Sequence, residues 1–385
     1  MVVTIERILP GGVGLAHSEG KTIFVSLAAP GDLVRITVDR EQGNLQFASI
    51  VEIVEPSPDR IEPPCPYFGR CGGCDFQQLN YDAQLTAKRE IIRDCFHRIA
   101  QLELPELEVV PSPATWRYRA RATWQLDQEL QTMGYYERGS RRVCDVVECA
   151  VLVPELQQTL EQLRSTPSSE LPRDLKHLDV VIGDNGVSVA PQFAQFQTTE
   201  LELTINEASY SYDAEAFFQV NQSVLDHLLG FALNKISGKT ALDLYCGVGL
   251  FTLPLARYFE RVTGVESNSV ATRFARRNLQ RAKLSNVNIV TANVAEWIRV
   301  GTDKLKSIDF VLLDPPRAGA ESVVIRGILN LNPAKICYVS CDPATLARDV
   351  KKLMAGGYKL DSIKGFDMFP QTHHVETVLH LSSAN

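Results

Sequence analysis

The sequence predicts an α/β protein in which an N-terminal β-barrel and a central, mostly β segment precede a doubly wound, mainly parallel sheet. Three observations support this order. Short β-rich runs with glycine turns fill the first 57 residues, strand-like patterns dominate from about residue 115 to 212, and from residue 213 apolar strands alternate with helices. Such alternation is typical of a parallel sheet that is covered by helices on both faces.

The first 57 residues are predicted to form a small barrel of five short strands. Their β-rich runs, "VTIERILPGGVGLA", "TIFVSLA" and "DLVRITVDREQGNLQFASIVEIVE", are separated by turn signals. "PSPDRIEPP" then places four prolines in nine residues, which indicates a domain boundary. We therefore expect three domains, at residues 1–57, 58–212 and 213–385.

Helices and strands are assigned within the two later domains by apolar periodicity. The central domain is predicted to hold helices in "YDAQLTAKREIIRDCFHRIAQL" and "PELQQTLEQLRS". In the last domain, strands are expected in "TALDLYC", "RVTGVE", "VNIVTAN", "IDFVLLDPP", "KICYVSC" and "ETVLHL", with helices in "FTLPLARYF" and "SVATRFARRNLQRAK".

Bulk composition sets limits on location and partners. The 385 residues start without a basic stretch followed by an apolar run, and no segment approaches the roughly eighteen apolar residues of a membrane span. We therefore expect no signal peptide, no membrane partner and a cytoplasmic location. The formal charge of −7 argues against a nucleic-acid partner unless basic residues gather on one face.

Polar and glycine residues follow the strands of the last domain. Ligands of such sheets bind at the carboxyl ends of the strands. Those ends carry Gly247, Gly249, Glu266, Asn293 and Asp314. Thr252 replaces the third glycine of the dinucleotide fingerprint, so an adenosyl ligand without a pyrophosphate is favoured over a nicotinamide cofactor.

Three of the nine cysteines cluster in "CPYFGRCGGCDFQ", as Cys65, Cys71 and Cys74, and Cys149 is a possible fourth ligand. A reduced compartment argues against a disulfide framework. Four thiolates suit either zinc or an iron–sulfur cluster, and the spacing alone leaves both open. If all four bind, no iron is left open for substrate, which favours a role in folding and RNA docking.

"YVSCDPATLARD", at residues 338–349, places Cys341 at the end of an apolar strand and just before a helix. From the residues alone, a nucleophile, a metal ligand and a buried apolar residue all remain open, and burial is the common fate of a free cysteine. The helix amino terminus is expected to favour a thiolate. Glu376 begins the last strand and could reach the same sheet edge, where desolvation would raise its basicity.

Together these motifs resemble one family, the RNA uracil-5-methyltransferases, in the branch with an N-terminal TRAM domain and a [4Fe–4S] cluster, which includes 23S rRNA 5-methyluridine methyltransferases. The resemblance covers nearly the whole chain. It rests on "CPYFGRCGGCDFQQL" with Cys149, "FFQVNQ" (217–222), "LDLYCGVGLFTLPLA" (242–256), "LLDPPRAGA" (312–320), "YVSCDPATLARD" and "FPQTHHVETVLHL" (369–381). It implies an OB-like TRAM barrel, a central iron–sulfur domain and a Rossmann-like class I methyltransferase domain.

The resemblance also implies roles for single residues. Cys341 would be the nucleophile and Glu376 the general base. S-adenosyl-L-methionine would be the cofactor, contacted by Gln219, Tyr245, Glu266, Asn293 and Asp314, and the [4Fe–4S] cluster would be held by Cys65, Cys71, Cys74 and Cys149.

Two residues depart from the family pattern. Leu250 stands where several members have an asparagine that contacts the cofactor, so that contact is expected to be lost. Asp342 replaces the commoner asparagine after the nucleophile, and its charge should disfavour a thiolate unless a positive group compensates. The role of Arg317 is left open.

The expected partner is RNA, bound by the chain as a monomer. Arg117, Arg119 and Arg121 in "TWRYRARATW" are predicted to lie on one face of a strand and to contact phosphates. For the arginines of "RFARRNLQRAK", a solvated helix face is at least as good an interpretation as RNA contact. Phe217 or Phe218 could stack on the target base.

The expected activity is formation of 5-methyluridine in 23S ribosomal RNA through a covalent Cys–uracil adduct. The same reaction on a T-loop uridine of transfer RNA is the nearest alternative. A non-catalytic iron–sulfur RNA-binding protein is a second one, and the presence of both Cys341 and Glu376 argues against it.

Overall fold

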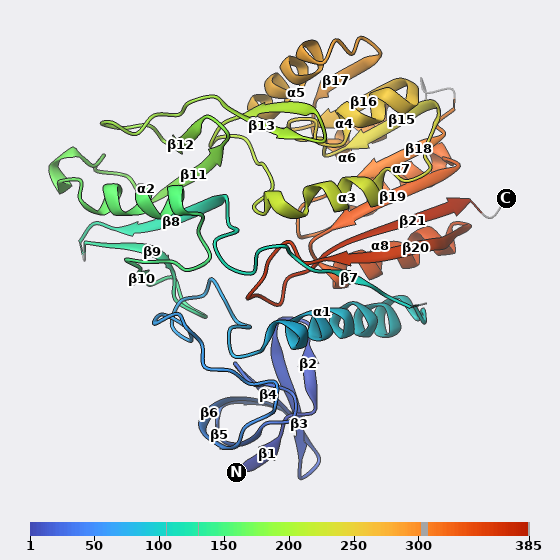
Figure 1. Cartoon of the computed structure of the whole chain (residues 1–385). Coiled ribbons are helices and arrows are strands. Elements are labelled where there is room, and N and C mark those ends of the chain that lie inside the picture. The colour runs from blue at the N-terminus through green and yellow to red at the C-terminus, as the bar shows by residue number, and fades with distance from the viewer. Residues whose placement is uncertain (105, 130, 302–306, 384–385) are drawn as a thin grey trace.

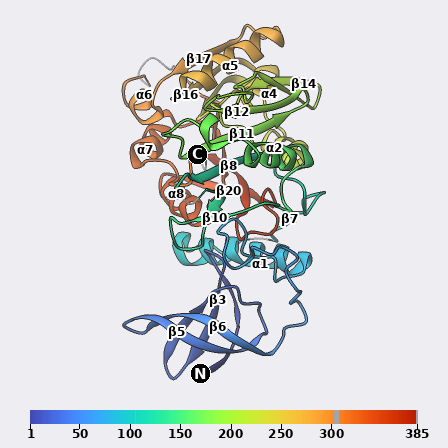
Figure 2. The same cartoon turned by 90° about the vertical axis from the view of Figure 1, so that its left-hand side faces the viewer.

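The computed structural model describes residues 1–104, 106–129, 131–301 and 307–383. Within these residues the strands form a six-stranded, a five-stranded, a two-stranded and an eight-stranded sheet. Figures 1 and 2 show the six-stranded sheet at one end of the molecule and the eight-stranded sheet toward the other. No helix among the described residues is long and apolar enough to cross a membrane.

The N-terminal sheet has six strands, one more than the sequence predicted. Its order is β1-β5-β6-β4-β3-β2, and the extra strand arises because the first expected run divides into three strands. Its interior is a small apolar cluster that includes Ile23, Val34 and Ile36. The strands are β1 (Val2–Thr4), β2 (Arg7–Leu9), β3 (Val13–Ser18), β4 (Lys21–Val25), β5 (Leu33–Gln42) and β6 (Leu45–Glu55).

The central region is mostly β, as expected. Its five-stranded sheet has the order β10-β9-β8-β11-β12, and α2 (Pro154–Arg164) packs against it through Leu156, Leu160 and Leu163. Val153 precedes α2 and Pro154 occupies its first turn, where a missing N–H costs nothing. The strands are β8 (Arg121–Asp127), β9 (Thr132–Tyr136), β10 (Val143–Asp145), β11 (His177–Gly183) and β12 (Gly186–Ala190), followed by the hairpin β13 (Leu201–Ile205) and β14 (Ala208–Tyr212).

The C-terminal sheet confirms the predicted α/β architecture. Its order is β17-β16-β15-β18-β19-β21-β20-β7, with parallel pairs from β17 to β19 and antiparallel pairs around β21. The strands are β15 (Gly238–Leu244), β16 (Phe259–Glu266), β17 (Val287–Thr291), β18 (Phe310–Leu313), β19 (Lys335–Ser340), β20 (Tyr358–Phe366), β21 (Glu376–Ser383) and β7 (Val109–Val110). Apolar strands of this kind are buried on both faces.

Helices cover both faces of this sheet, which makes it doubly wound. One apolar cluster joins one face to α3 (Leu225–Ala232), α4 (Thr252–Tyr258) and α5 (Ser269–Arg281). A second cluster joins the other face to α1 (Tyr81–Cys95), α6 (Val294–Gly301), α7 (Ser322–Leu331) and α8 (Pro343–Ala355). Burying each large apolar side chain of these clusters contributes about 1.5–3 kcal/mol.

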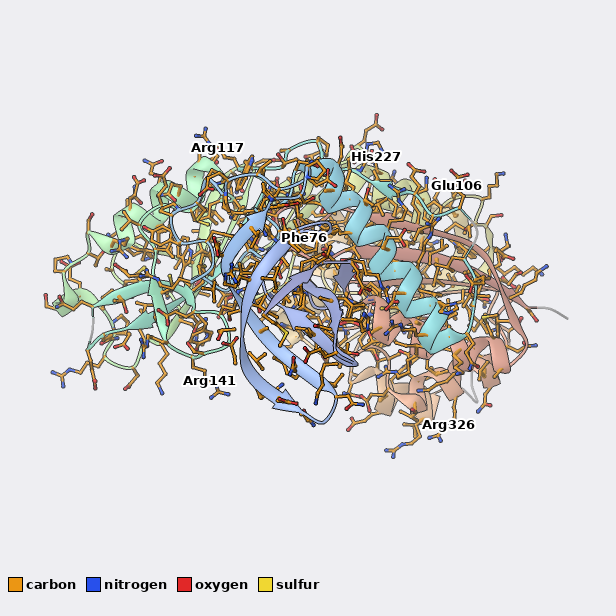
Figure 3. The ribbon with its side chains drawn as sticks, turned by 90° about the horizontal axis from the view of Figure 1, so that it is seen from below. Phe76, Glu106, Arg117, Arg141, His227 and Arg326 are labelled. Carbon is orange, nitrogen blue, oxygen red and sulfur yellow. The ribbon has the colours of Figure 1, made fainter. Side chains whose placement is uncertain are left out.

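An early segment of the chain completes the C-terminal sheet. β7 pairs in parallel with the end of β20, and Ile92 and Cys95 of α1 lie in the same apolar cluster as α8. On its other side α1 contacts the N-terminal sheet through a cluster that contains Ile8, Phe76 and Ile91. Figure 3 shows α1 running beside that sheet, with Phe76 near the contact. Helix α1 therefore contacts both the N-terminal sheet and the C-terminal sheet.

Candidate active site and metal centre

Four of the expected cofactor residues follow neighbouring parallel strands. Tyr245, Glu266, Asn293 and Asp314 end or follow β15, β16, β17 and β18, which are adjacent in the sheet. Because these strands run in parallel, their carboxyl ends meet at one edge of the sheet. Gln219 is 8% exposed, in the segment between β14 and α3. The assignment of all five to the cofactor stays a prediction.

The turn after β15 brings backbone and carboxylate together. Gly247 has φ +53° and Gly249 has φ +92°, and a Cβ at Gly249 would lie 2.9 Å from Leu253 Cδ1. Glu266 Oε2 accepts a hydrogen bond from the Gly247 N–H at 3.2 Å, so this carboxylate sits directly at the glycine turn. Leu250 packs in the apolar cluster, and its carbonyl accepts the Tyr210 hydroxyl at 3.1 Å.

Two aspartates lie at this edge, of which Asp243 is fully buried and Asp314 is half-buried. Burial raises the pKa of Asp314 to about 7, and burial likewise raises the pKa of Asp243 to about 7. Asp243 accepts a hydrogen bond from the Thr252 hydroxyl through Oδ2, while its Oδ1 has no partner within the described residues. Asp243 was not singled out from the sequence, where it reads as one more residue of an apolar strand.

Cys341 and Glu376 come together at the next strands. Ser340 at the end of β19 pairs with Thr377 of the antiparallel β21, so Cys341 and Glu376 are the next residues outward from this pair. Glu376 is 4% exposed. Burial, and then the neighbouring Asp314, raise its pKa well above the ordinary value. The expectation that desolvation raises the basicity of Glu376 is therefore confirmed in direction.

The free Cys341 thiol is not poised as a thiolate. Burial raises its pKa to about 12, and the largest charge effect, from Glu376, acts in the same direction. The expectation that the helix amino terminus would hold a thiolate is therefore wrong for the free protein. Asp342 has the smallest of the named effects, and its Oδ1 caps α8 by accepting the Thr345 N–H at 2.8 Å. Aspartate and asparagine serve equally well as such a cap.

Arg317 supplies the positive group at this edge. It follows Asp314 by three residues, and its charge lowers the pKa values of both Cys341 and Glu376. Its Nη2 lies 3.3 Å from His374 Nε2. Burial, and then His373 and Arg317, lower the pKa of His374 to about 3, so this imidazole is neutral and can accept a hydrogen bond from Arg317.

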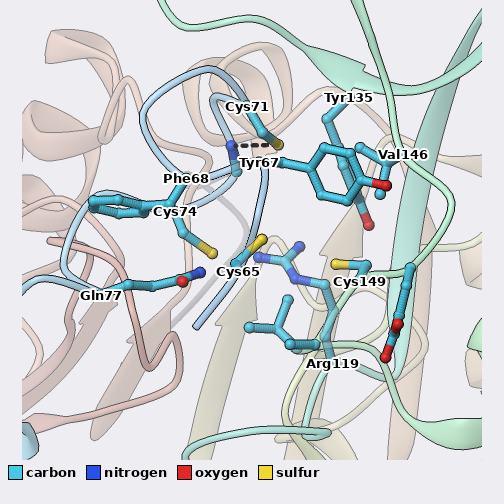
Figure 4. A pocket seen from close by; sticks show the side chains of 14 residues that line it. Cys65, Tyr67, Phe68, Cys71, Cys74, Gln77, Arg119, Tyr135, Val146 and Cys149 are labelled. Carbon is cyan, nitrogen blue, oxygen red and sulfur yellow. Dashed lines mark hydrogen bonds between the residues drawn. The ribbon is translucent and has the colours of Figure 1, made fainter. Parts of the chain in front are cut away.

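The four cysteines expected to bind metal line a single cavity. Figure 4 shows Cys65, Cys71, Cys74 and Cys149 around it, together with Arg119 and Tyr135. Burial raises the pKa of Cys71 to about 11 and that of Cys74 to about 12. A cavity in which thiolates are disfavoured without a counter-charge is suited to a cationic metal group. No three Cys, His, Asp or Glu side chains of the described residues are arranged to hold a single metal ion.

The prediction that Arg117, Arg119 and Arg121 lie on one face of a strand is wrong. β8 begins only at Arg121, and Arg117 has φ +52°, so strand alternation does not extend through these arginines. Arg119 lines the cysteine cavity instead and forms no salt bridge with any described residue. Arg121 is turned inward and donates to the Ala216 and Ala214 carbonyls at 2.7 and 2.9 Å.

Three of the four arginines of α5 pair with acidic residues of the same chain, and the first of them, Arg273, lies 3.6 Å from Asp213. Arg277 pairs with Glu200, and Arg281 pairs with Glu202 at 2.9 Å. These contacts support the interpretation of a solvated helix face. Of the two phenylalanines considered for base stacking, Phe218 is buried and stacked on Tyr212, whereas Phe217 is 58% exposed. Only Phe217 is free to meet a substrate.

Comparison with known proteins supports the same interpretation. The family model described as tRNA (Uracil-5-)-methyltransferase matches residues 192–384. The chain is 31% identical to the 23S rRNA (uracil(1939)-C(5))-methyltransferase of Vibrio parahaemolyticus, over 98% of this chain and 94% of that protein. It is 33% identical to the enzyme of the same description from Pectobacterium atrosepticum, over 98% and 92%.

A solved structure is similar over the full length. The Pyrococcus abyssi tRNA (uracil-54, C5)-methyltransferase in complex with S-adenosyl-L-homocysteine has a TM-score of 0.76 and 26% identity, and the match covers 99% of this chain and 100% of that one.

Proposed function

The chain belongs to the RNA (uracil-5-)-methyltransferase family, and we propose that it forms 5-methyluridine in 23S ribosomal RNA with S-adenosyl-L-methionine as methyl donor. The observation that carries the proposal is the Ser340–Thr377 pair, which brings Cys341 and Glu376 to one position beside Asp314.

The residues at the sheet edge fit S-adenosyl-L-methionine. Glu266 is held at the glycine turn by the Gly247 N–H and can accept hydrogen bonds from both ribose hydroxyls. Asn293, Tyr245, Asp314 and the buried Gln219 complete the proposed contacts. When bound, the cofactor supplies an electrophilic methyl group at this edge.

The chemistry at uracil is assigned to Cys341 and Glu376. Carbon 5 of uracil is too weakly nucleophilic to take a methyl group directly. Attack of the Cys341 sulfur on carbon 6 converts the ring to an enolate, whose carbon 5 can then accept the methyl group. Glu376 removes the carbon 5 proton, the sulfur–carbon bond breaks, and the electron pair restores the ring double bond.

Arg317 is proposed to support the thiolate. Its charge lowers the pKa of Cys341, which the buried setting otherwise raises. Because Glu376 must accept a proton late in the cycle, it has to be ionised by then, and Arg317 favours that form as well. His374 Nε2 can accept a hydrogen bond from Arg317 Nη2, which fits the position of the guanidinium.

The four-cysteine cavity is proposed to hold a [4Fe–4S] cluster. The four cysteines line one cavity, and four thiolates are the ligand set of such a cluster. Arg119 is half-buried in that cavity and forms no salt bridge with a described residue, which fits an anionic assembly of four thiolates and a cluster. Zinc is the competing outcome.

The N-terminal sheet, at residues 1–57, is proposed to be a TRAM domain that contacts RNA. Ribosomal RNA is favoured as the target because relatives of that description match 98% of this chain at 31–33% identity. A T-loop uridine of transfer RNA is the second candidate, because the transfer RNA enzyme of Pyrococcus abyssi shares the full-length fold. A loop uridine is expected in either case, since the base must be unstacked to reach Cys341.

Two experiments test this proposal. RNA containing 5-fluorouridine should trap a covalent complex with the wild-type protein, and Cys341→Ala should abolish it. A complex that still forms with Cys341→Ala would refute the assignment of Cys341 as the nucleophile.

Mapping 5-methyluridine in ribosomal and transfer RNA from cells that lack the protein identifies the target RNA. Loss of 5-methyluridine from transfer RNA alone would favour the second candidate.

A further inference from the structure

Glu376, the proposed general base, follows a loop between β20 and β21 that is hydrogen-bonded to other parts of the chain. Strand β20 ends at Phe366 and β21 begins at Glu376. We name residues 369–375 of this connection the base loop, because the loop leads directly into Glu376. Glu376 itself pairs with Phe366 of β20, so the base loop closes directly on the residue proposed as the base.

The cysteine-rich segment binds the base loop directly. Asp75 follows Cys74 in the chain, and the backbone N–H groups of Asp75 and Phe76 both donate to the Gln371 carbonyl, at 3.1 and 3.0 Å. The Asp75 carboxylate in turn accepts the His373 backbone N–H at 2.8 Å and pairs with His373 Nδ1. Four hydrogen bonds therefore join two residues after Cys74 to two residues of the base loop.

Further anchors come from the middle of the chain. The Gln84 side chain of α1 accepts the Gln371 N–H and donates to Gln371 Oε1, both at 3.0 Å. The Tyr118 hydroxyl donates to the Pro370 carbonyl at 2.8 Å. Gln371 has φ +68°, a conformation that costs a non-glycine residue about 1 kcal/mol or more and persists only where neighbours enforce it.

A turn of the N-terminal sheet lies against the same Asp75–His373 contact. Gly12 lies in the turn between β2 and β3 with φ +75°, and a Cβ there would meet His373 Cβ at 3.0 Å and Asp75 Oδ2 at 3.1 Å. Three separate parts of the chain thus meet at the Asp75–His373 pair. On the far side, the His373 ring packs on His374, with centroids 4.0 Å apart, and His374 contacts Arg317.

The cysteine-rich segment has little regular structure of its own. From residue 61 to residue 80 the described chain contains neither a helix nor a ladder strand, only turns and isolated bridges. Burial of Phe76 and Leu79 and backbone hydrogen bonds to other parts of the chain hold this segment, and a group bound by its cysteines would add to these contacts. A metal group that holds Cys65, Cys71 and Cys74 also fixes the adjoining Asp75, because the side chains share one short backbone.

We propose that Asp75 is a positioning residue for Glu376, and that filling the four-cysteine cavity sets the geometry of the base loop and hence the rate of proton removal. The metal group would then act on the reaction through the Asp75–His373 pair without meeting the substrate. This inference rests on the proposed function.

The first test compares Asp75→Ala with Asp59→Ala in iron-loaded protein. Asp59 is an exposed aspartate two residues before this segment, and its carboxylate accepts a hydrogen bond from the Asn80 side chain and makes no hydrogen bond or salt bridge with the described residues 369–375. Asp75→Ala should lower kcat by roughly 10–100-fold, the effect of a misplaced catalytic group, with KM for the methyl donor and iron content unchanged. The methylated Cys341–RNA adduct should accumulate, since proton removal becomes slow. Asp75→Asn, which keeps an acceptor for the His373 N–H, should restore part of the rate.

The second test needs no turnover. Hydrogen exchange of residues 369–375 is followed by mass spectrometry in iron-loaded protein, in protein from which iron has been removed by a chelator, and in Asp75→Ala. The His373 amide should exchange at least tenfold faster in the last two. Unchanged exchange after iron removal would overturn the coupling, and a rate loss in Asp75→Ala that only matches its loss of iron would overturn the positioning role.

The outcomes separate this inference from the proposed function. If the wild-type protein and Asp59→Ala fail to methylate any RNA, the proposed function is wrong. If both methylate RNA and Asp75→Ala does so at the same rate, only the coupling is wrong.

Discussion

Cys341 and Glu376 emerge next to each other from the antiparallel strands β19 and β21, one residue beyond the paired Ser340 and Thr377. The nucleophile and the base proposed for one reaction are thus fixed by a single step of strand register. A shift of β21 by one residue would turn Glu376 to the opposite face of the sheet, so register and reactivity are inseparable here.

Glu376→Gln should stop the cycle after methyl transfer. The amide keeps the size of the side chain but cannot take the carbon 5 proton, so the methylated adduct on Cys341 should accumulate on unmodified RNA. Turnover should fall by roughly 10²–10⁴-fold, the usual contribution of a general base. Denaturing gels and mass spectrometry of the adduct check this. Normal product release from Glu376→Gln would remove Glu376 from the mechanism.

Arg317→Met should make the Cys341 thiol still harder to ionise. Burial raises the pKa of Cys341 to about 12 and Arg317 lowers it, so removing the cation moves the pKa further upward. Alkylation of Cys341 by iodoacetamide should therefore be slow at pH 7, rise steadily to pH 10 and beyond, and be slower in the variant at each pH. A free cysteine would level off above about pH 8.5. Mass spectrometry of the peptide around Cys341 gives the rates.

Buried Asp243 should make the cofactor-free protein less stable as pH rises. Its pKa is raised to about 7 in the folded state, so the folded state binds the proton more tightly than the unfolded chain does. The contribution is present near pH 4 and is lost as pH rises to 7, by up to about 1.4 kcal/mol per pH unit. Asp243→Asn should flatten the pH dependence of the urea midpoint between pH 5 and 7. An unchanged slope would contradict the prediction.

Arg119→Met should destabilise a cluster in the cysteine cavity. The guanidinium lies in that cavity and offsets negative charge on thiolates, so its loss should lower the reduction potential, on the order of 100 mV. Iron should also dissociate faster. Redox titration of the visible absorption and timed chelation measure both effects. Arg117→Met, an exposed change two residues away, is the control and should behave like wild type.

Lys88 and Asp367 form a fully buried ion pair, in which Lys88 also donates to the Phe369 carbonyl at 2.9 Å. Asp367→Asn leaves the ammonium without its counter-charge and should reduce the free energy of unfolding by about 3–5 kcal/mol. The double variant Lys88→Met/Asp367→Leu removes both charges and should lose less. Urea denaturation of the wild-type protein, Asp367→Asn and the double variant measures the free energy of unfolding of each. A double variant less stable than Asp367→Asn would show that the pair itself is stabilising.

Apolar periodicity and cysteine spacing predicted the elements and the shared cysteine site correctly, whereas contacts between residues far apart in the sequence were not predicted. The alternation of strands and helices predicted the C-terminal sheet, because each element carries its own apolar signal. Cysteine spacing predicted a shared site, and the four thiols line one cavity.

The failures have definite physical causes. The alternation of Arg117, Arg119 and Arg121 resembled a strand, but the positive φ of Arg117 breaks the period and Arg119 enters the cysteine cavity. The two-residue strand β7 is too short to leave a pattern. The Asp75–His373 contact spans 298 residues, and no local pattern reports such a pairing.

The place of β7 in the C-terminal sheet bears on how the protein is made. Val109 and Val110 pair with the last residues of β20, about 250 positions later in the chain. At a synthesis rate of about 5–20 residues per second, the ribosome needs on the order of 12–50 s to reach that partner. Until then the apolar face of α1 lacks its C-terminal sheet and offers a binding surface to chaperones. The catalytic half is therefore not an autonomous fragment, and a polypeptide that starts after residue 212 would lack one edge of its own sheet.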